Sequence, residues 1–173
     1  GPATGAVISQ RERLRKDGSW VEWLPLAALL WHQTEEWVWP GGFLPWINRE
    51  VCGSEGDEFP ITRRLGLLIN VGLGWGVGLG AGTTRDPGLS ALQLSIMAGN
   101  VALHGSQAVR TRSRNPGLLT AAALFLPLTA AGFPALVRRT PASRRRIAIA
   151  AAIGTGGSAV LPAVLRLRVA RRG

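Results

Sequence analysis

Residues 24–39 read Leu24-Pro-Leu-Ala-Ala-Leu-Leu-Trp-His32-Gln-Thr-Glu35-Glu36-Trp-Val-Trp39, an apolar run that contains one histidine and two adjacent carboxylates. On an α-helix the spacings 32/35 and 32/36 place His32, Glu35 and Glu36 on or near one face. Ionisable groups are costly to bury in an apolar segment and are rarely there without a partner or a function. This helix is therefore predicted to turn its polar face toward protein, and the three residues are the leading candidates for an active centre.

The rest of the chain predicts that this helix lies in a membrane. Only 17% of the 173 residues are charged, against roughly 25% in an ordinary soluble protein. Four later apolar blocks contain no Asp, Glu, Lys or Arg, and each is close to the roughly 20 helical residues that cross a hydrocarbon core. We predict an all-α integral membrane protein, a single transmembrane domain over 1–173 with a polar loop at 40–64 and about five transmembrane helices at residues 20–39, 65–82, 89–109, 118–137 and 147–165.

The basic residues lie mainly between the apolar blocks, and they give the chain its formal net charge of +10. Arginines at the ends of membrane helices meet anionic lipid headgroups, whereas a nucleic-acid groove needs a soluble face to carry it. The sequence therefore predicts membrane lipid as a partner and argues against nucleic acid. The first 18 residues are polar and basic and lead directly into the first span, which predicts no cleavable signal peptide.

The second predicted span has glycine at every second position from 72 to 82. A period of two is typical of a strand, but an open strand cannot cross lipid, so we predict a helix. On a helix Gly74, Gly78 and Gly82 form one ridge of small residues, and the other three glycines form a second ridge on nearly the opposite side. This helix is expected to pack between two others.

The third predicted span carries a polar stripe. Gln93, Asn100 and Gln107 recur every seven residues and His104 follows Asn100 at i+4, so all four lie on one side of an otherwise apolar helix. Such a side must face protein or water rather than lipid. We predict that it meets the histidine and carboxylate face of the first span, with Asn70 of the second span approaching from the side.

Two kinds of chemistry suit this arrangement. In the favoured one, Glu35 and Glu36 share about one proton and act as acid and base on a lipid or terpenoid-like hydrophobic substrate, with His32 and His104 as tuning or relay partners. In the alternative, His32, Glu35, Glu36 and His104 bind zinc or iron, although no cofactor is favoured. A non-enzymatic lipid or small-molecule binding protein, and a network that only fixes helix packing, also remain open.

Further residues are candidates for binding or orienting the substrate. Indole rings beside an acid stabilise a carbocation, which favours an isomerase or cyclase type of reaction. The amide candidates are Asn70, Gln93, Asn100 and Gln107, and the indole candidates are Trp31, Trp37 and Trp75. The other tryptophans near the first span, Trp20, Trp23 and Trp46, are predicted to form an interfacial belt.

The sequence resembles the HXXEE family of small bacterial membrane proteins over roughly residues 24–137. The namesake pattern is His32-Gln-Thr-Glu35-Glu36, and it is followed by Asn100-Val-Ala-Leu-His104 and by Pro116-Gly117-Leu-Leu-Thr120. The resemblance implies a bacterial plasma-membrane protein and assigns no reaction. A weaker analogy, in five spans with buried His, Glu, Asn and Trp, is to sterol isomerases of the emopamil-binding type, with which the chain shares no motif.

Overall fold

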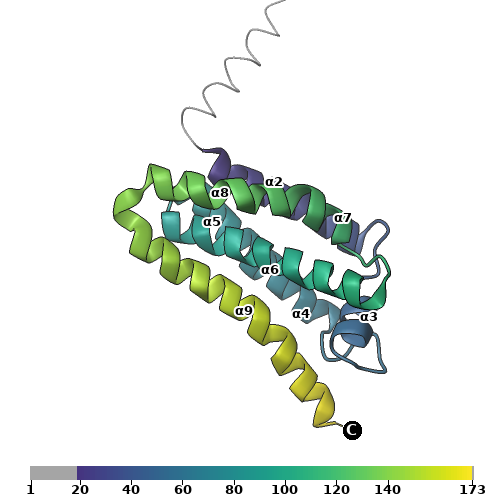
Figure 1. Cartoon of the computed structure of the whole chain (residues 1–173). Coiled ribbons are helices and arrows are strands. Elements are labelled where there is room, and N and C mark those ends of the chain that lie inside the picture. The colour runs from purple at the N-terminus through teal and green to yellow at the C-terminus, as the bar shows by residue number, and fades with distance from the viewer. Residues whose placement is uncertain (1–18, 173) are drawn as a thin grey trace, which may run out of the picture.

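The computed structural model describes residues 19–172, and all regular secondary structure in that part of the chain is helical. Residues 1–18, for which no cleavable signal peptide was predicted, and residue 173 lie outside the described part. The all-α prediction is thus confirmed for the described residues. Five long helices follow the order of the predicted spans (Figure 1), and they are α2 (Trp20–Trp37), Arg63–Thr84, α6 (Pro87–Thr111), Leu118–Arg139 and α9 (Arg144–Ala170).

Two of these helices contain a π-helical segment. The α4–α5 helix consists of α4 (Arg63–Leu67), η2 (Leu68–Trp75) and α5 (Gly76–Thr84). The α7–α8 helix consists of α7 (Leu118–Thr120), η3 (Ala121–Phe125) and α8 (Leu126–Arg139). Short π-helical segments inside α-helices are frequent at functional sites, and both of these segments contribute to the cavity described below.

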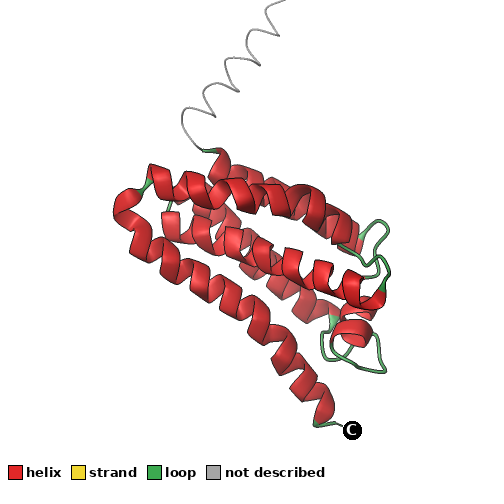
Figure 2. Ribbon diagram, viewed as in Figure 1, coloured by secondary structure: helices red, strands yellow, loops and turns green. Residues whose placement is uncertain are grey.

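The helix α6 lies at the centre of the bundle, where it contacts α2, α5, α8 and α9 (Figure 2). It begins sharply because the Asp86 side chain accepts hydrogen bonds from the backbone N–H groups of Gly88 and Leu89, both at 2.9 Å, and Pro87 occupies the first helical position. The surrounding helices bury Gln93, His104 and Gln107 of the polar stripe, as the sequence pattern predicts.

Three helices of the described part are long and apolar enough to cross a membrane: α4–α5, α7–α8, and Pro141–Ala170, which joins the 3-10 turn η4 (Pro141–Ser143) to α9. Only 11% of the apolar stretch in the last of these is buried, so most of its side chains form an outer surface suited to lipid. The helices α2 and α6 are not among these three. The helix α2 carries three carboxylates, and α6 carries the polar stripe. The structure therefore supports a membrane protein with three clear spans, fewer than the five predicted.

One glycine ridge of α4–α5 packs closely against α2. An added Cβ atom would lie 3.1 Å from an α2 side chain at Gly74 and 2.8 Å from one at Gly78 and at Gly82. Because these positions have no side chain, the two helices approach closely. The other side of α5 contacts α6, so the expectation that this helix packs between two others is confirmed.

The segment predicted as a polar loop is partly helical and has a buried face. It contains α3 (Phe43–Trp46) and the π-helical η1 (Ile47–Val51). The fully buried Asn48 accepts from the Ile61 N–H and donates to the Ile61 carbonyl, both at 2.9 Å, which ties the two ends of the segment together. Ile47 and Ile61 pack with Leu165 of α9 in one hydrophobic cluster. Residues 43–62, here called the cap segment, therefore cover one end of the bundle.

The ion pair between Glu22 and Arg139 joins α2 to α8. Glu22 is fully buried, and its second carboxylate oxygen accepts from the Arg139 guanidinium at 3.2 Å. Glu22→Gln is expected to lower the free energy of unfolding by about 1–3 kcal/mol, because it removes the buried charge that accepts the hydrogen bonds of Arg139. Thermal unfolding in detergent measures the effect, and Glu55→Gln, at an exposed carboxylate of the cap segment, is the control. Equal stability of the two variants would show that the pair contributes nothing.

Candidate metal centre

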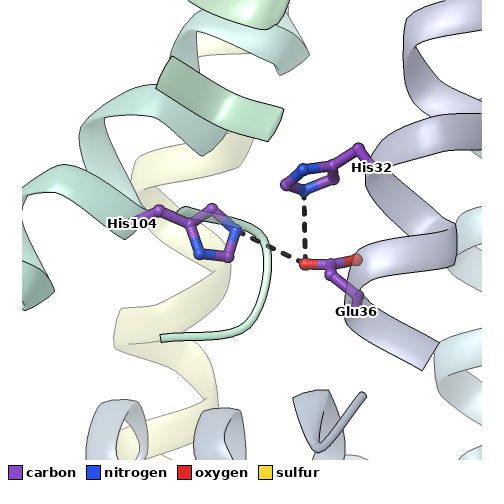
Figure 3. A group of neighbouring side chains, drawn as sticks. All are labelled: His32, Glu36 and His104. Atoms are coloured by element: carbon purple, nitrogen blue, oxygen red, sulfur yellow. Dashed lines mark ion pairs between the residues drawn. The ribbon is translucent and has the colours of Figure 1, made fainter. Parts of the chain in front are cut away.

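His32, Glu36 and His104 converge inside the bundle, as Figure 3 shows. His32 and Glu36 lie one turn apart on α2, and His104 comes from α6. The Nε2 atoms of His32 and His104 lie 3.3 Å and 3.4 Å from the same Glu36 oxygen, Oε1. All three side chains are at most 3% exposed. The predicted contact between the first and third spans is confirmed.

Hydrogen bonds on the far side of each ring determine which nitrogen carries the proton. The Thr120 hydroxyl donates to Glu35 Oε2 at 2.5 Å, so its oxygen accepts from His32 Nδ1–H at 2.8 Å. The Asn115 amide nitrogen donates to the His104 carbonyl, which turns Asn115 Oδ1 toward His104 Nδ1 at 2.8 Å, where it accepts. In the neutral rings both protons are therefore on Nδ1, and both Nε2 lone pairs face Glu36.

Three acceptors thus meet without a donor among the described residues. The Nε2 atoms of His32 and His104 are buried and make no hydrogen bond, so a cation placed between them would satisfy all three acceptors. A hydrogen bond from an imidazolium to a carboxylate measures about 2.7–2.9 Å, shorter than the distances found here. Ligand atoms placed tetrahedrally about 2.0–2.1 Å from zinc are roughly 3.3–3.5 Å apart. The two nitrogen–oxygen distances are therefore compatible with three ligands of one metal ion.

Glu35 faces away from the three acceptors. Its carboxylate accepts from the backbone N–H groups of Leu119 at 3.1 Å and Thr120 at 2.8 Å, at the start of α7–α8, as well as from the Thr120 hydroxyl. A carboxylate is well placed at a helix amino terminus because it satisfies unpaired N–H groups there. Glu35 thus holds Thr120, which in turn orients His32, whereas Glu36 faces the histidines. The pair expected to share a proton has separate partners.

Three residues around the site had no predicted role there. Gly117 has φ +90° and lies between the rings, where an added Cβ atom would be 2.7 Å from the Cε1 atoms of both His32 and His104. Trp46, predicted to lie in an interfacial belt, instead stacks on His104 with ring centroids 4.9 Å apart. Phe125 of η3 packs on His32 at 4.4 Å.

Three of the four predicted amides line the cavity, and the fourth does not. Asn70, Gln93 and Asn100 line the cavity next to the cluster. Gln107 lies elsewhere, because its Oε1 accepts from the Arg110 guanidinium at 2.8 Å and 3.0 Å.

The predicted indoles lie outside the cluster. Trp31 is 66% exposed, so it faces outward. Trp37 packs against Phe43 of the cap segment, and Trp75 donates to Gln33 Oε1 at 2.6 Å. The only indole ring stacked on a cluster residue in the described part of the chain is that of Trp46.

A cavity of about 500 Å³ opens beside His32 and Glu36. It lies among α2, α4–α5, α6, η3, α9 and the cap segment, and its wall is mostly apolar, with Leu29, Ile69, Leu73, Ile96, Leu103 and Leu161 among its side chains. Its size lies within the range of small-molecule sites. The candidate metal ligands are therefore in reach of a buried hydrophobic molecule.

No curated protein and no solved structure matches this chain. One family model matches, described as a protein of unknown function with HXXEE motif, over residues 23–131. The matched range includes the namesake residues His32, Glu35 and Glu36 as well as His104 and Thr120, so the whole cluster lies within it. This chain belongs to the HXXEE family.

Proposed function

We propose that this protein is a metal-dependent membrane enzyme that binds zinc or iron through His32, Glu36 and His104 and acts on a hydrophobic, lipid-like or terpenoid-like substrate. The observation that carries the proposal is the convergence of two imidazole lone pairs and one carboxylate oxygen, with no donor among them, at the wall of an apolar cavity. Two histidines and one carboxylate are a ligand set of catalytic zinc and of non-haem iron.

The surroundings favour a catalytic rather than a purely structural metal. Structural zinc is enclosed by four protein ligands, whereas three ligands leave a coordination position open. A metal bound here would supply Lewis-acid activation of a substrate oxygen or of water. The chain itself orients the ligands through Thr120 and Asn115, and the apolar wall excludes bulk water from the reacting groups.

Two alternatives have less support. In direct acid/base catalysis by Glu36, His32 and His104 would act as relay partners through hydrogen bonds, and the separations of 3.3 Å and 3.4 Å are longer than such charged hydrogen bonds usually are. The shared proton expected between Glu35 and Glu36 is not favoured by their separate partners. A protein that only binds lipid has no need for three converging acceptors, because an apolar cavity suffices.

The same proposal places the whole bundle in the bacterial plasma membrane, with α2 and α6 crossing it beside the three clear spans. Several of the charged and polar side chains that make these two helices less apolar face inward: Glu22, His32, Glu36, Gln93 and His104 are buried in the described structure. An inward polar face is how a membrane helix accommodates such residues.

Cobalt substitution tests both the metal and its accessibility. Metal-free protein in lipid nanodiscs, titrated with Co²⁺, is expected to develop visible absorption bands that saturate at one equivalent. Addition of a long-chain alkyl hydroxamate is expected to change these bands, because an open position on the cavity side can take the ligand. No bands would contradict a metal site at the cluster, and bands insensitive to the hydroxamate would show a closed structural site.

Thr120→Val is expected to weaken zinc binding by about 10–100-fold, because it removes the acceptor that orients His32. The valine has nearly the same shape, so the helices should remain folded. Competition with a chromophoric chelator measures the affinity. Thr129→Val is the control on the same helix, since the Thr129 hydroxyl donates only to backbone carbonyls of its own helix, such as that of Phe125 at 2.9 Å. Equal affinities for the two variants would rule out this role of Thr120.

A further inference from the structure

Gln93 is a buried amide without a partner. It is 3% exposed, and neither its side-chain oxygen nor its side-chain nitrogen makes a hydrogen bond to any described residue. Leaving such buried groups unpaired destabilises the folded protein. A buried amide of this kind is expected where a bound molecule supplies the missing partners.

The amide lines the same cavity as His32 and Glu36. It lies eleven residues before His104 on α6, which corresponds to about 16 Å along the helix axis. Two residues with unpaired polar atoms, His32 of the metal-ligand cluster and Gln93, thus line the same mostly apolar cavity.

The other amides and the serine in the cavity wall have partners. Asn70 donates to the Gly66 carbonyl and Asn100 donates to the Ile96 carbonyl, both at 2.9 Å. The Ser158 hydroxyl donates to a carbonyl of its own helix at 2.9 Å. Gln93 is also held close to α5, where an added Cβ atom at Gly78 would lie 2.8 Å from its Nε2 atom. Its lack of a partner is therefore particular to this position.

We infer that the cavity takes an elongated hydrophobic molecule with a polar group at each end, one at His32, Glu36 and His104 and the other hydrogen-bonded to Gln93. The first contact rests on the proposed function. The group at Gln93 is a neutral hydroxyl or carbonyl, because an amide both donates and accepts and because a charge is costly in an apolar wall. The spacing between the two places sets the length of the molecule.

The test uses alkyl hydroxamates of increasing chain length, each with and without a terminal hydroxyl group. Dissociation constants are measured by calorimetry in nanodiscs, and empty nanodiscs correct for partition into lipid. At one chain length the terminal hydroxyl is expected to tighten binding about threefold to tenfold, the effect of one added hydrogen bond. For shorter and longer chains, the ratio of the dissociation constants measured without and with the terminal hydroxyl should be close to one.

Variants of Gln93 assign the contact. Gln93→Met should bring the ratio to one at every chain length while the metal content stays unchanged. Gln93→Asn should move the highest ratio to a longer chain, because the shorter side chain holds its amide farther from the bound molecule. Ser158→Ala, which removes a cavity hydroxyl that already has a partner, should leave the ratio as it is. A ratio near one at every length, as expected if water occupies the Gln93 site, would overturn the inference, and so would a ratio retained by Gln93→Met.

The series is measured on both zinc-loaded and metal-free protein. A hydroxamic acid also donates hydrogen bonds to a carboxylate, so the ratio can be read in either state. Failure to bind zinc would contradict the proposed function but leave the ratio as an independent result. Zinc binding with no effect of the terminal hydroxyl would contradict the second contact alone.

Discussion

Glu36→Gln is expected to abolish zinc binding at the cluster and, at the same time, to stabilise the metal-free protein. The loss follows because a neutral amide replaces the carboxylate that faces both histidines. The gain follows because the glutamine NH₂ group has two donors for two imidazole lone pairs that otherwise have none. Zinc affinity should fall by more than the roughly 100-fold limit for residues that merely orient a ligand. The metal-free bundle should gain about 1 kcal/mol or more.

Glu35→Gln is the matched comparison, one position away on the same helix. Its single oxygen can still accept from the N–H and hydroxyl groups of Thr120, and only the acceptor of the Leu119 N–H is lost, so zinc affinity should fall by no more than about 10–100-fold. Chelator competition and thermal unfolding of metal-free protein give both quantities. If the two variants lose affinity equally, or if Glu36→Gln destabilises the metal-free protein, the assignment of Glu36 as the ligand is wrong.

Gly117→Ala is expected to destroy the site for a steric reason. Its Cβ atom would lie 2.7 Å from a carbon of each imidazole ring, closer than real side-chain contacts allow, so both rings must move. The backbone at φ +90° adds strain of about 1–2 kcal/mol for any residue with a Cβ atom. We expect zinc affinity to fall by more than about 100-fold and the unfolding temperature to fall as well.

Gly53→Ala separates these two effects. Gly53 also has a positive φ, +74°, but an added Cβ atom there would meet nothing within 4 Å. It should therefore lower stability through backbone strain and leave zinc affinity unchanged. Retention of wild-type zinc affinity by Gly117→Ala would show that the rings are not held as described.

The ligands from the two helices could be predicted from the sequence because a helix has a fixed period. His32 and Glu36 are one turn apart, and the cost of facing lipid requires their face to meet the polar side of α6 that includes His104. The same period could not distinguish Glu35 from Glu36. Their difference depends on where the turn after α6 brings Thr120, which is a tertiary contact.

The supporting residues could not be assigned for the same reason. Asn115 and Gly117 belong to the connection between α6 and α7–α8, and their roles depend on its path past the two imidazole rings. The Pro116-Gly117-Leu-Leu-Thr120 pattern of the family resemblance marked the place but not the contacts. Trp46 reaches His104 because the cap segment folds back over the bundle. From the sequence alone, a tryptophan in this segment is equally typical of a membrane interface.

Metal content of the purified protein tests the central claim most directly. Wild-type protein in lipid nanodiscs is loaded with zinc and dialysed against buffer, and its zinc content is measured by elemental mass spectrometry. The double variant His32→Ala/His104→Ala is treated and measured in the same way. We predict one equivalent of zinc per chain in the wild type and none in the double variant, with the same helical content in both. A wild-type protein that retains no more zinc than the double variant would contradict a metal site at His32, Glu36 and His104.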